Sequence, residues 1–262
     1  MIFFIDIDGT ITDATRGLDS ITDKTRYALK ALSENHKVFV SSGRCKTLLP
    51  KELREMEGIG FITTNGAYAE YNNKPLFSRF MDKDKVIALR RYCLYHNLSY
   101  ILEKQDTIFK GGRDDLYDRF ISAWSMLAGN VEDDKGLNED YYMAMIIAES
   151  NDLCPKIEED IKPYLDIRKH YSFSSFDVGE YGIDKGYGVK RVLEILNVPV
   201  EESYAFGDEM NDYEMIKESG HGIVMANGNP KLKQIAEEIC EDVLEDGLYK
   251  YLVKHKIIEA MI

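Results

Sequence analysis

The sequence predicts an α/β fold: a doubly wound, parallel-sheet core that is interrupted by an inserted α+β module. Three observations lead to this class. Short, continuous apolar runs near both ends of the chain are typical of strands buried on both faces, and amphipathic stretches alternate with them. In the middle, the predicted strands instead come in adjacent pairs, which favours antiparallel neighbours. We expect a core of residues 1–81 and 185–262, with residues 82–184 inserted between its halves.

The N-terminal part of the core has the rhythm of parallel βαβ units. Thr22–Ser33 predicts a helix because its apolar residues fall on one stripe. The apolar runs that predict buried strands are Met1–Ile5, Lys37–Val40 and Gly60–Thr63.

The inserted module, from about Asp82, reads as helix, strand, strand, helix, strand, helix, strand and strand. Its predicted strands are fairly long and rich in aromatic or β-branched residues, as in Ser99–Glu103, Tyr141–Glu149 and Phe176–Tyr181. One of its helices is predicted from the apolar stripe Leu116, Phe120, Ala123, Trp124 and Leu127.

After Gly182 the parallel rhythm resumes. The predicted helices are Lys185–Leu196, which is amphipathic, and Asp212–Ser219. The predicted strands between and after them are Ser203–Phe206 and Gly222–Met225.

Composition excludes several classes of protein. The 262 residues carry 33 basic and 46 acidic side chains, so the net charge of −13 argues against a nucleic-acid or anionic-membrane partner. The longest apolar run, Tyr141–Ala148, is too short to span a membrane, and the N-terminus lacks the pattern of a signal peptide. The four cysteines are scattered, with no metal-binding pair. We expect a cytoplasmic protein, a monomer or homodimer.

Acidic side chains follow two predicted strands of the core. Asp6-Ile7-Asp8-Gly9-Thr10 comes after the first strand, and Asp208 and Asp212 follow Ser203–Phe206. Because ligands of parallel sheets bind at the carboxyl ends of the strands, these acids would share one crevice. An EF-hand loop would need glycine at position 11, where isoleucine stands. Helix capping explains one of Asp208 and Asp212 but not both.

A hydroxyl group and a lysine occupy equivalent places. Ser41-Ser42-Gly43-Arg44 follows the Lys37–Val40 strand, and its hydroxyl and backbone N–H groups suit a phosphoryl oxygen. Lys185 opens a helix, where the helix dipole disfavours a cation unless an anion lies nearby. Alone, Ser42 could merely cap a helix and Lys185 could be a solvated surface residue. Together with four carboxylates, they imply a phosphate site in which Mg²⁺ lets the acids coexist.

In this order, the motifs DIDGT, SSGR, the lysine of IDKG and GDEMND resemble those of the haloacid dehalogenase (HAD) superfamily, in particular its phosphatase branch. The large insertion and the NGA at Asn65–Ala67 resemble the Cof-type subfamily (IIB), which has an α/β cap. The resemblance implies a Rossmann-like, HAD-like core with a cap domain at 82–184 that sets substrate specificity.

For the reacting groups, the resemblance implies four roles. Asp6 would be the nucleophile that forms an aspartyl-phosphate, and Asp8 would protonate the leaving alcohol and then activate water. Ser42 would hold a phosphoryl oxygen, and Lys185 would balance the charge of Asp6 and the phosphate. Ser42 departs slightly from the threonine common at this position, but it keeps the hydroxyl.

For the metal, the resemblance implies that Asp6, the backbone carbonyl of Asp8, and Asp208 hold Mg²⁺. Asp212 would orient these ligands without binding the ion itself, and Asn211 would lie near the phosphate.

Further candidates for substrate binding are Gly43, Arg44, Asn65, Lys110 and Arg113. Each has an ordinary alternative: an ion pair for Arg44, a turn for Asn65-Gly66, and a flexible solvated loop for Phe109–Arg113.

The expected function is a Mg²⁺-dependent phosphatase of small phosphorylated metabolites, sugar phosphates first. The alternatives are a hexose phosphomutase with the same motifs, or a non-catalytic module that binds phosphometabolites. A GxGxxG motif after a strand and a P-loop are both absent from the sequence.

Overall fold

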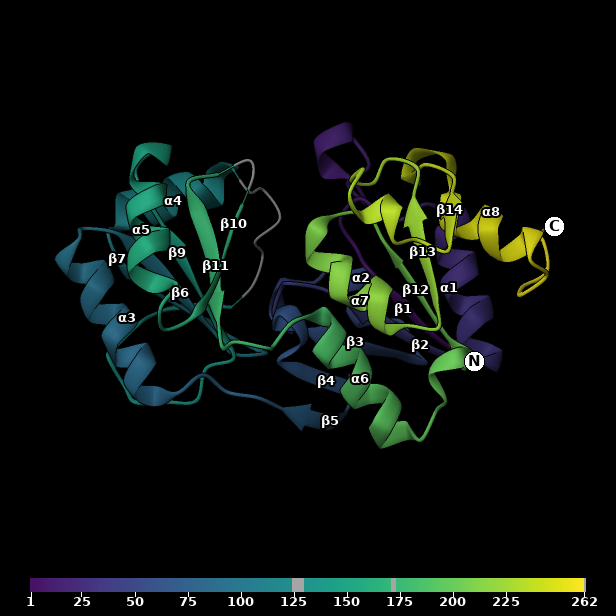
Figure 1. The fold of residues 1–262 in the computed structure, drawn as a ribbon, viewed down its shortest axis with the longest axis horizontal. Coiled ribbons are helices and arrows are strands. Elements are labelled where there is room, and N and C mark those ends of the chain that lie inside the picture. The colour runs from purple at the N-terminus through teal and green to yellow at the C-terminus, as the bar shows by residue number, and fades with distance from the viewer. Residues whose placement is uncertain (124–129, 171–172, 262) are drawn as a thin grey trace. The chain divides into compact units, whose positions relative to one another are not determined.

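The chain forms two compact units in the computed structural model (Figure 1). The structure describes residues 1–123, 130–170 and 173–261. The first unit comprises Met1–Gly43, Pro50–Phe77 and Asp184–Ile262, and the second comprises Arg44–Leu49 and Ser78–Ile183.

The sheet of the first unit has the strand order β14-β13-β12-β1-β2-β3-β4-β5. Neighbouring strands from β14 to β3 are parallel, and β4 is antiparallel to β3. The strands are β1 (Ile2–Ile5), β2 (Lys37–Ser41), β3 (Ile59–Thr63), β4 (Tyr68–Tyr71), β5 (Lys74–Ser78), β12 (Ser203–Gly207), β13 (His221–Met225) and β14 (Glu238–Cys240). The prediction of an α/β core with a parallel sheet is confirmed.

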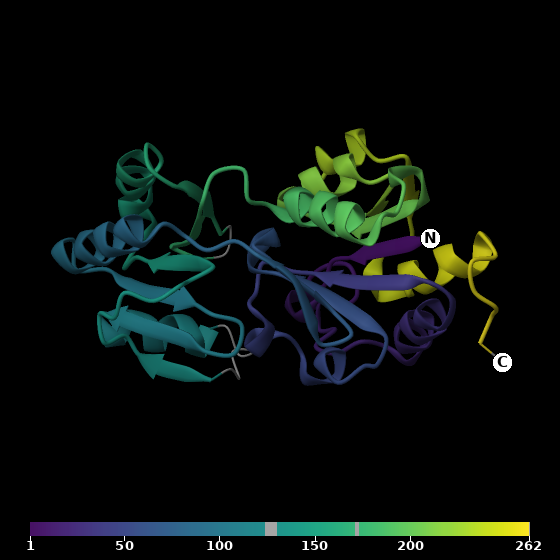
Figure 2. The same ribbon diagram turned by 90° about the horizontal axis from the view of Figure 1, so that it is seen from below.

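Helices cover both faces of this sheet. Figure 2 shows α6 (Lys185–Leu196) and α7 (Tyr213–Glu218) on one face, with α1 (Asp23–Asn35) and α8 (Gly247–Lys254) on the other. A short helix, α2 (Lys51–Arg54), precedes β3. Apolar side chains of β1 and α6 meet in one buried cluster, which fixes α6 against the central strand.

The second unit contains a sheet of order β10-β11-β9-β6-β7-β8. Its pairs are antiparallel except for β7 and β8, which are parallel. The strands are β6 (Ser99–Glu103), β7 (Ile108–Gly112), β8 (Val131–Asp133), β9 (Met143–Ile147), β10 (Asp166–Lys169) and β11 (Ser175–Gly179). The helices are α3 (Lys83–Tyr95), α4 (Asp114–Ala123) and α5 (Cys154–Ile161). Of the stripe predicted for α4, Trp124 and Leu127 lie outside the described residues.

The structure differs from the sequence-based expectation at several points; one is β8, an additional strand between α4 and β9 that the predicted order of the module lacks. The sequence assigns residues 44–49 to the core, whereas in the structure Cys45 and Leu48 join an apolar cluster on the sheet of the second unit. The expected flexible loop at Phe109–Arg113 is wrong, because residues 108–112 form β7. Its glycines allow close packing: a Cβ on Gly111 would lie 2.3 Å from the Tyr100 ring.

Among the described residues, no helix combines the length and the apolar character needed to cross a membrane.

Candidate active site

Asp6 lies at the carboxyl end of the central strand β1. Its N–H donates a hydrogen bond to the Phe206 carbonyl (2.9 Å), which ties it to the end of β12. The chain then forms a tight turn in which three successive N–H groups, those of residues 10–12, donate to the Ile7 carbonyl. Asp6 is buried at 5% exposure, whereas Asp8, on the turn, is exposed.

Gly9 allows the first acidic loop to approach Asp208. Its φ is +87°, and a Cβ at this position would lie 2.0 Å from Asp208 Oδ2. Any other residue would therefore be strained and would displace the Asp208 carboxylate. The glycine of the DIDGT motif is thus required both by the turn and by the close contact.

Lys185 is wholly buried at the start of α6, directly after the N-cap residue Asp184. Its Nζ donates to Asp6 Oδ1 at 2.5 Å and to Asp212 Oδ1 at 2.6 Å. Burial by itself lowers the pKa of Lys185, but the two carboxylates outweigh burial and raise the pKa well above its usual range. Lys185 therefore carries its charge throughout the physiological range.

The oxygens of Asp212 are all engaged. Oδ1 accepts from Lys185, and Oδ2 accepts from the N–H groups of Asp208 (3.0 Å) and Glu209 (3.2 Å). Asp212 thereby holds both the lysine and the loop that carries Asp208, which is the arrangement of a supporting residue.

The group of neighbouring carboxylates suits a divalent cation. Carboxylate oxygens of Asp6, Asp208 and Asp212 lie within 4.8 Å of one another, and Lys185 bonds to Asp6 and Asp212. Among the described residues, the buried Asp208 Oδ1 has no hydrogen-bond partner. Burial first, and then the neighbouring carboxylates, raise the pKa of Asp6 and of Asp208. A hard cation would satisfy the orphaned oxygen and offset this excess of negative charge, so these residues fit Mg²⁺.

Ser42 and Asn65 come together from two strand ends. Ser42, which is buried, follows β2 and donates its N–H to the Ile62 carbonyl (2.9 Å), and the Asn65 N–H donates to the Ser42 carbonyl (3.2 Å). Asn65 has a left-handed conformation (φ 51°), and a Cβ on Gly43 would lie 3.1 Å from its Oδ1. The turn after β3 therefore shapes the Ser42-Gly43 loop.

The same turn also contacts the segment that carries Lys185. A Cβ on Gly66 (φ +92°) would lie 1.9 Å from the Asp184 carbonyl oxygen. Glycine at 66 lets the turn pack against the first residues of α6, so Asn65-Gly66 is more than a connection.

The remaining predicted residues are Asn211, Arg44, Lys110 and Arg113. Asn211 is half-buried on the short turn Met210–Asp212. Arg44, Lys110 and Arg113 belong to the second unit. Lys110 pairs with Asp114 (2.7 Å) and Asp133 (3.5 Å), and Arg113 pairs with Asp115 and Glu149 (2.8 Å to Glu149), so carboxylates of their own unit bind both cations.

Sequence reasoning missed Asn227 and Asn229, which follow β13. Their side chains contact the loops that carry the acids: Asn227 Nδ2 donates to the Gly9 carbonyl, and Asn229 Nδ2 donates to Glu209, both at 2.7 Å. The available signal was an Asn-Gly-Asn sequence one residue after a predicted parallel strand, at the same edge as the acids.

Known proteins share this organisation. The family model of haloacid dehalogenase-like hydrolases matches residues 3–252. The chain is 29% identical over 257 residues to "Putative phosphatase YkrA" of Bacillus subtilis (strain 168), covering 97% of this chain and 96% of that protein. It is 24% identical over 266 residues to 5-amino-6-(5-phospho-D-ribitylamino)uracil phosphatase YitU of the same organism, covering 96% of each.

A solved structure has a similar fold. The HAD subclass IIB sugar phosphatase BT4131 superposes with a TM-score of 0.83 at 23% identity, covering 98% of this chain and 99% of that chain. Because the family model spans nearly the whole sequence, the chain belongs to the haloacid dehalogenase-like hydrolases.

Proposed function

We propose that the protein is a Mg²⁺-dependent phosphatase that hydrolyses small phosphate monoesters through an aspartyl-phosphate on Asp6. Sugar phosphates are the substrates we expect it to prefer. One observation carries the proposal. A wholly buried lysine bridges Asp6 and Asp212, while a neighbouring buried carboxylate oxygen, Asp208 Oδ1, has no hydrogen-bond partner among the described residues. A site with this excess of buried acid is suited to a cation and a phosphoryl group.

In the first half-reaction, Asp6 attacks phosphorus and the bond to the leaving oxygen breaks. Asp8 gives its proton to that oxygen, so the alcohol departs neutral. The exposure of Asp8 fits this role, because a group that exchanges protons with substrate and water must be accessible. Asp6, held by Lys185 and by the Phe206 carbonyl, is oriented for attack.

In the second half-reaction, Asp8 takes a proton from water, and the water oxygen attacks phosphorus. The acyl-phosphate bond then breaks, which releases inorganic phosphate and restores the Asp6 carboxylate. Ser42 and Lys185 stabilise the equatorial phosphoryl oxygens. Asp6, the Asp8 carbonyl and Asp208 would hold Mg²⁺, which would neutralise the negative charge that develops on the phosphoryl group.

The second unit is proposed as the cap that selects the substrate. Sugar phosphates come first because the names of two proteins similar to this chain point to phosphorylated sugar derivatives: YitU is a phosphatase of a 5-phospho-D-ribityl compound, and BT4131 is a sugar phosphatase.

The test is phosphate release from a panel of monoesters, with Mg²⁺ and then with excess chelator. The panel should include hexose and pentose phosphates, 5-amino-6-(5-phospho-D-ribitylamino)uracil, pyridoxal phosphate and flavin mononucleotide. Chelator-sensitive release, with sugar phosphates hydrolysed fastest, is expected. Isomerisation of a hexose phosphate without net phosphate release would replace the proposal with a mutase.

Asp6→Asn tests the nucleophile. Phosphate release should fall to background while the thermal melting curve keeps its cooperative shape. Asp19→Asn, which changes an exposed acid, is the matched control and should retain wild-type release. Retained activity in Asp6→Asn would overturn the assignment of the nucleophile.

A further inference from the structure

One loop, Ala226–Asn229 after β13, contacts both acid-bearing loops of the site. Asn227 Nδ2 donates to the Gly9 carbonyl at 2.7 Å. The N–H of Asn229 donates to the Asp208 carbonyl at 2.7 Å, and its Nδ2 donates to Glu209 Oε1. The sequence motifs and the mechanism above assign no role to these asparagines.

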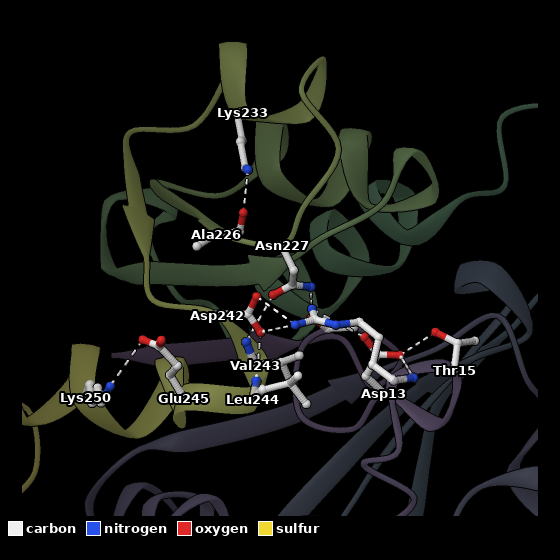
Figure 3. Close-up of polar contacts among 12 residues, drawn as sticks. Asp13, Thr15, Ala226, Asn227, Lys233, Asp242, Val243, Leu244, Glu245 and Lys250 are labelled. Carbon is white, nitrogen blue, oxygen red and sulfur yellow. Dashed lines mark hydrogen bonds and ion pairs between the residues drawn. The ribbon is translucent and has the colours of Figure 1, made fainter.

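The amide of Asn227 is oriented by a second contact. Its Oδ1 accepts from the Val243 N–H at 3.0 Å, in the network around Asp242 that Figure 3 shows. With the amide oxygen held by Val243, the NH₂ group must face Gly9. An aspartate would have the same shape, but it would place a charged oxygen against the Gly9 carbonyl oxygen.

The Gly9 carbonyl matters because Gly9 touches the proposed metal ligand Asp208. The Cα of Gly9 packs directly against the Asp208 carboxylate, so a shift of the Gly9 peptide would change the position available to that carboxylate. Asn227 fixes the Gly9 side of the contact, and the Asn229 N–H fixes the backbone of Asp208.

We propose that Asn227 and Asn229 are positioning residues that set the spacing between the Asp6–Gly9 loop and Asp208, and thereby the affinity for Mg²⁺. This inference rests on the cation site of the proposed function. Residues that orient metal ligands from behind typically change metal affinity by about 10–100-fold when they are replaced.

The experiment is calorimetric titration of the full chain with Mg²⁺, without substrate. Asn227→Asp should weaken Mg²⁺ binding by about 10–100-fold. Phosphate release should recover towards the wild-type rate at saturating Mg²⁺, because the reacting groups are intact. A purely structural defect would lower the rate at every Mg²⁺ concentration.

Arg16→Gln is the matched control. Arg16 also joins the segment after the first acidic loop to Asp242, through a bidentate ion pair at 3.0 Å, but this pair is exposed. Its loss should change Mg²⁺ affinity by no more than about threefold. An equal loss of affinity in Arg16→Gln, or unchanged affinity in Asn227→Asp, would overturn the inference.

Asn229→Ala provides a second variant if Asn227→Asp does not fold, as judged by its melting curve. This variant removes the hydrogen bond to Glu209 but keeps the backbone hydrogen bond to Asp208, so a smaller loss of Mg²⁺ affinity is expected. An unchanged Mg²⁺ affinity in Asn229→Ala would overturn the inference. Wild-type protein that binds Mg²⁺ but hydrolyses no ester would contradict the proposed function only. Wild-type protein that binds no Mg²⁺ would overturn the inference itself.

Discussion

Each unit buries a cluster of charged side chains, and the two clusters differ in balance. In the first unit, Lys185 bonds two of three neighbouring carboxylates, and Asp208 Oδ1 has no partner among the described residues. In the second unit, Arg90 binds Asp134 through two hydrogen bonds of 2.7 and 2.8 Å. Tyr100 and the Gly136 N–H donate to the same carboxylate.

This difference in charge balance distinguishes a candidate functional site, the cluster around Lys185, from a structural ion pair, that of Arg90 and Asp134. The Arg90–Asp134 pair is neutral, and both carboxylate oxygens of Asp134 accept hydrogen bonds, so nothing further need bind there. The cluster around Lys185 has more acid than its cation offsets, which costs stability unless a ligand supplies positive charge. An unbalanced buried cluster therefore indicates function better than burial of charge alone.

The largest effect is expected from Lys185→Met. It leaves Asp6 and Asp212 buried without their cation, which should cost about 3–5 kcal/mol in the free energy of unfolding. Phosphate release should fall by about 10²–10³-fold or more. Urea unfolding and initial-rate measurements check the two effects, and near-normal release would contradict the role of Lys185.

Arg90→Met should separate stability from activity. The substitution leaves the buried Asp134 without its cation and should lower the free energy of unfolding by about 3 kcal/mol. Because the proposed reacting groups lie in the first unit, the rate per folded molecule should stay within about threefold of wild type. A rate that falls as far as that of Lys185→Met would break the comparison between the clusters.

Mg²⁺ should stabilise the protein through the unbalanced cluster. At a concentration 100 times the dissociation constant, binding to the folded state alone adds about 2.7 kcal/mol. Asp208→Asn should lose this increment, whereas Arg90→Met should keep it. Urea unfolding with and without Mg²⁺ measures it, and an equal increment in Asp208→Asn would show that the ion binds elsewhere.

Glu103 provides the smallest test. Burial first, and then the charge of Asp177, raise the pKa of Glu103 to about 8, while the thiol and N–H of Cys45 hydrogen-bond to its carboxyl group. A folded-state pKa above the unfolded value means that its contribution to stability is fully present below about pH 4 and is lost as pH rises towards 8.

Glu103→Gln removes this titration. The variant should match wild type near pH 4, and its advantage in the free energy of unfolding should grow by up to about 1.4 kcal/mol per pH unit between pH 5 and pH 8. The exposed Glu159→Gln is the control and should show no such difference. Parallel pH profiles for wild type and Glu103→Gln would contradict the buried, protonated state of Glu103.

Local patterns were sufficient for many elements. The predicted ranges Ser99–Glu103 and Lys185–Leu196 coincide with β6 and α6, since the first is centred on aromatic and β-branched residues and the second follows an aspartate N-cap. The glycines of β7 misled the prediction, because Gly111 admits the Tyr100 ring and Gly112 packs against the Leu98 carbonyl, rather than allowing motion. Nothing local distinguishes these two uses of glycine.

The sequence by itself determined the α/β alternation and the placing of acids, a hydroxyl and a lysine after apolar strands, because periodicity and turn residues are local properties. Only the tertiary structure decided which carboxylate bonds Lys185, which oxygen stays without a partner, and that Asn227 reaches the Gly9 carbonyl. These contacts join residues far apart in the chain, and their geometry depends on how the strands pack, so no short stretch of sequence encodes them.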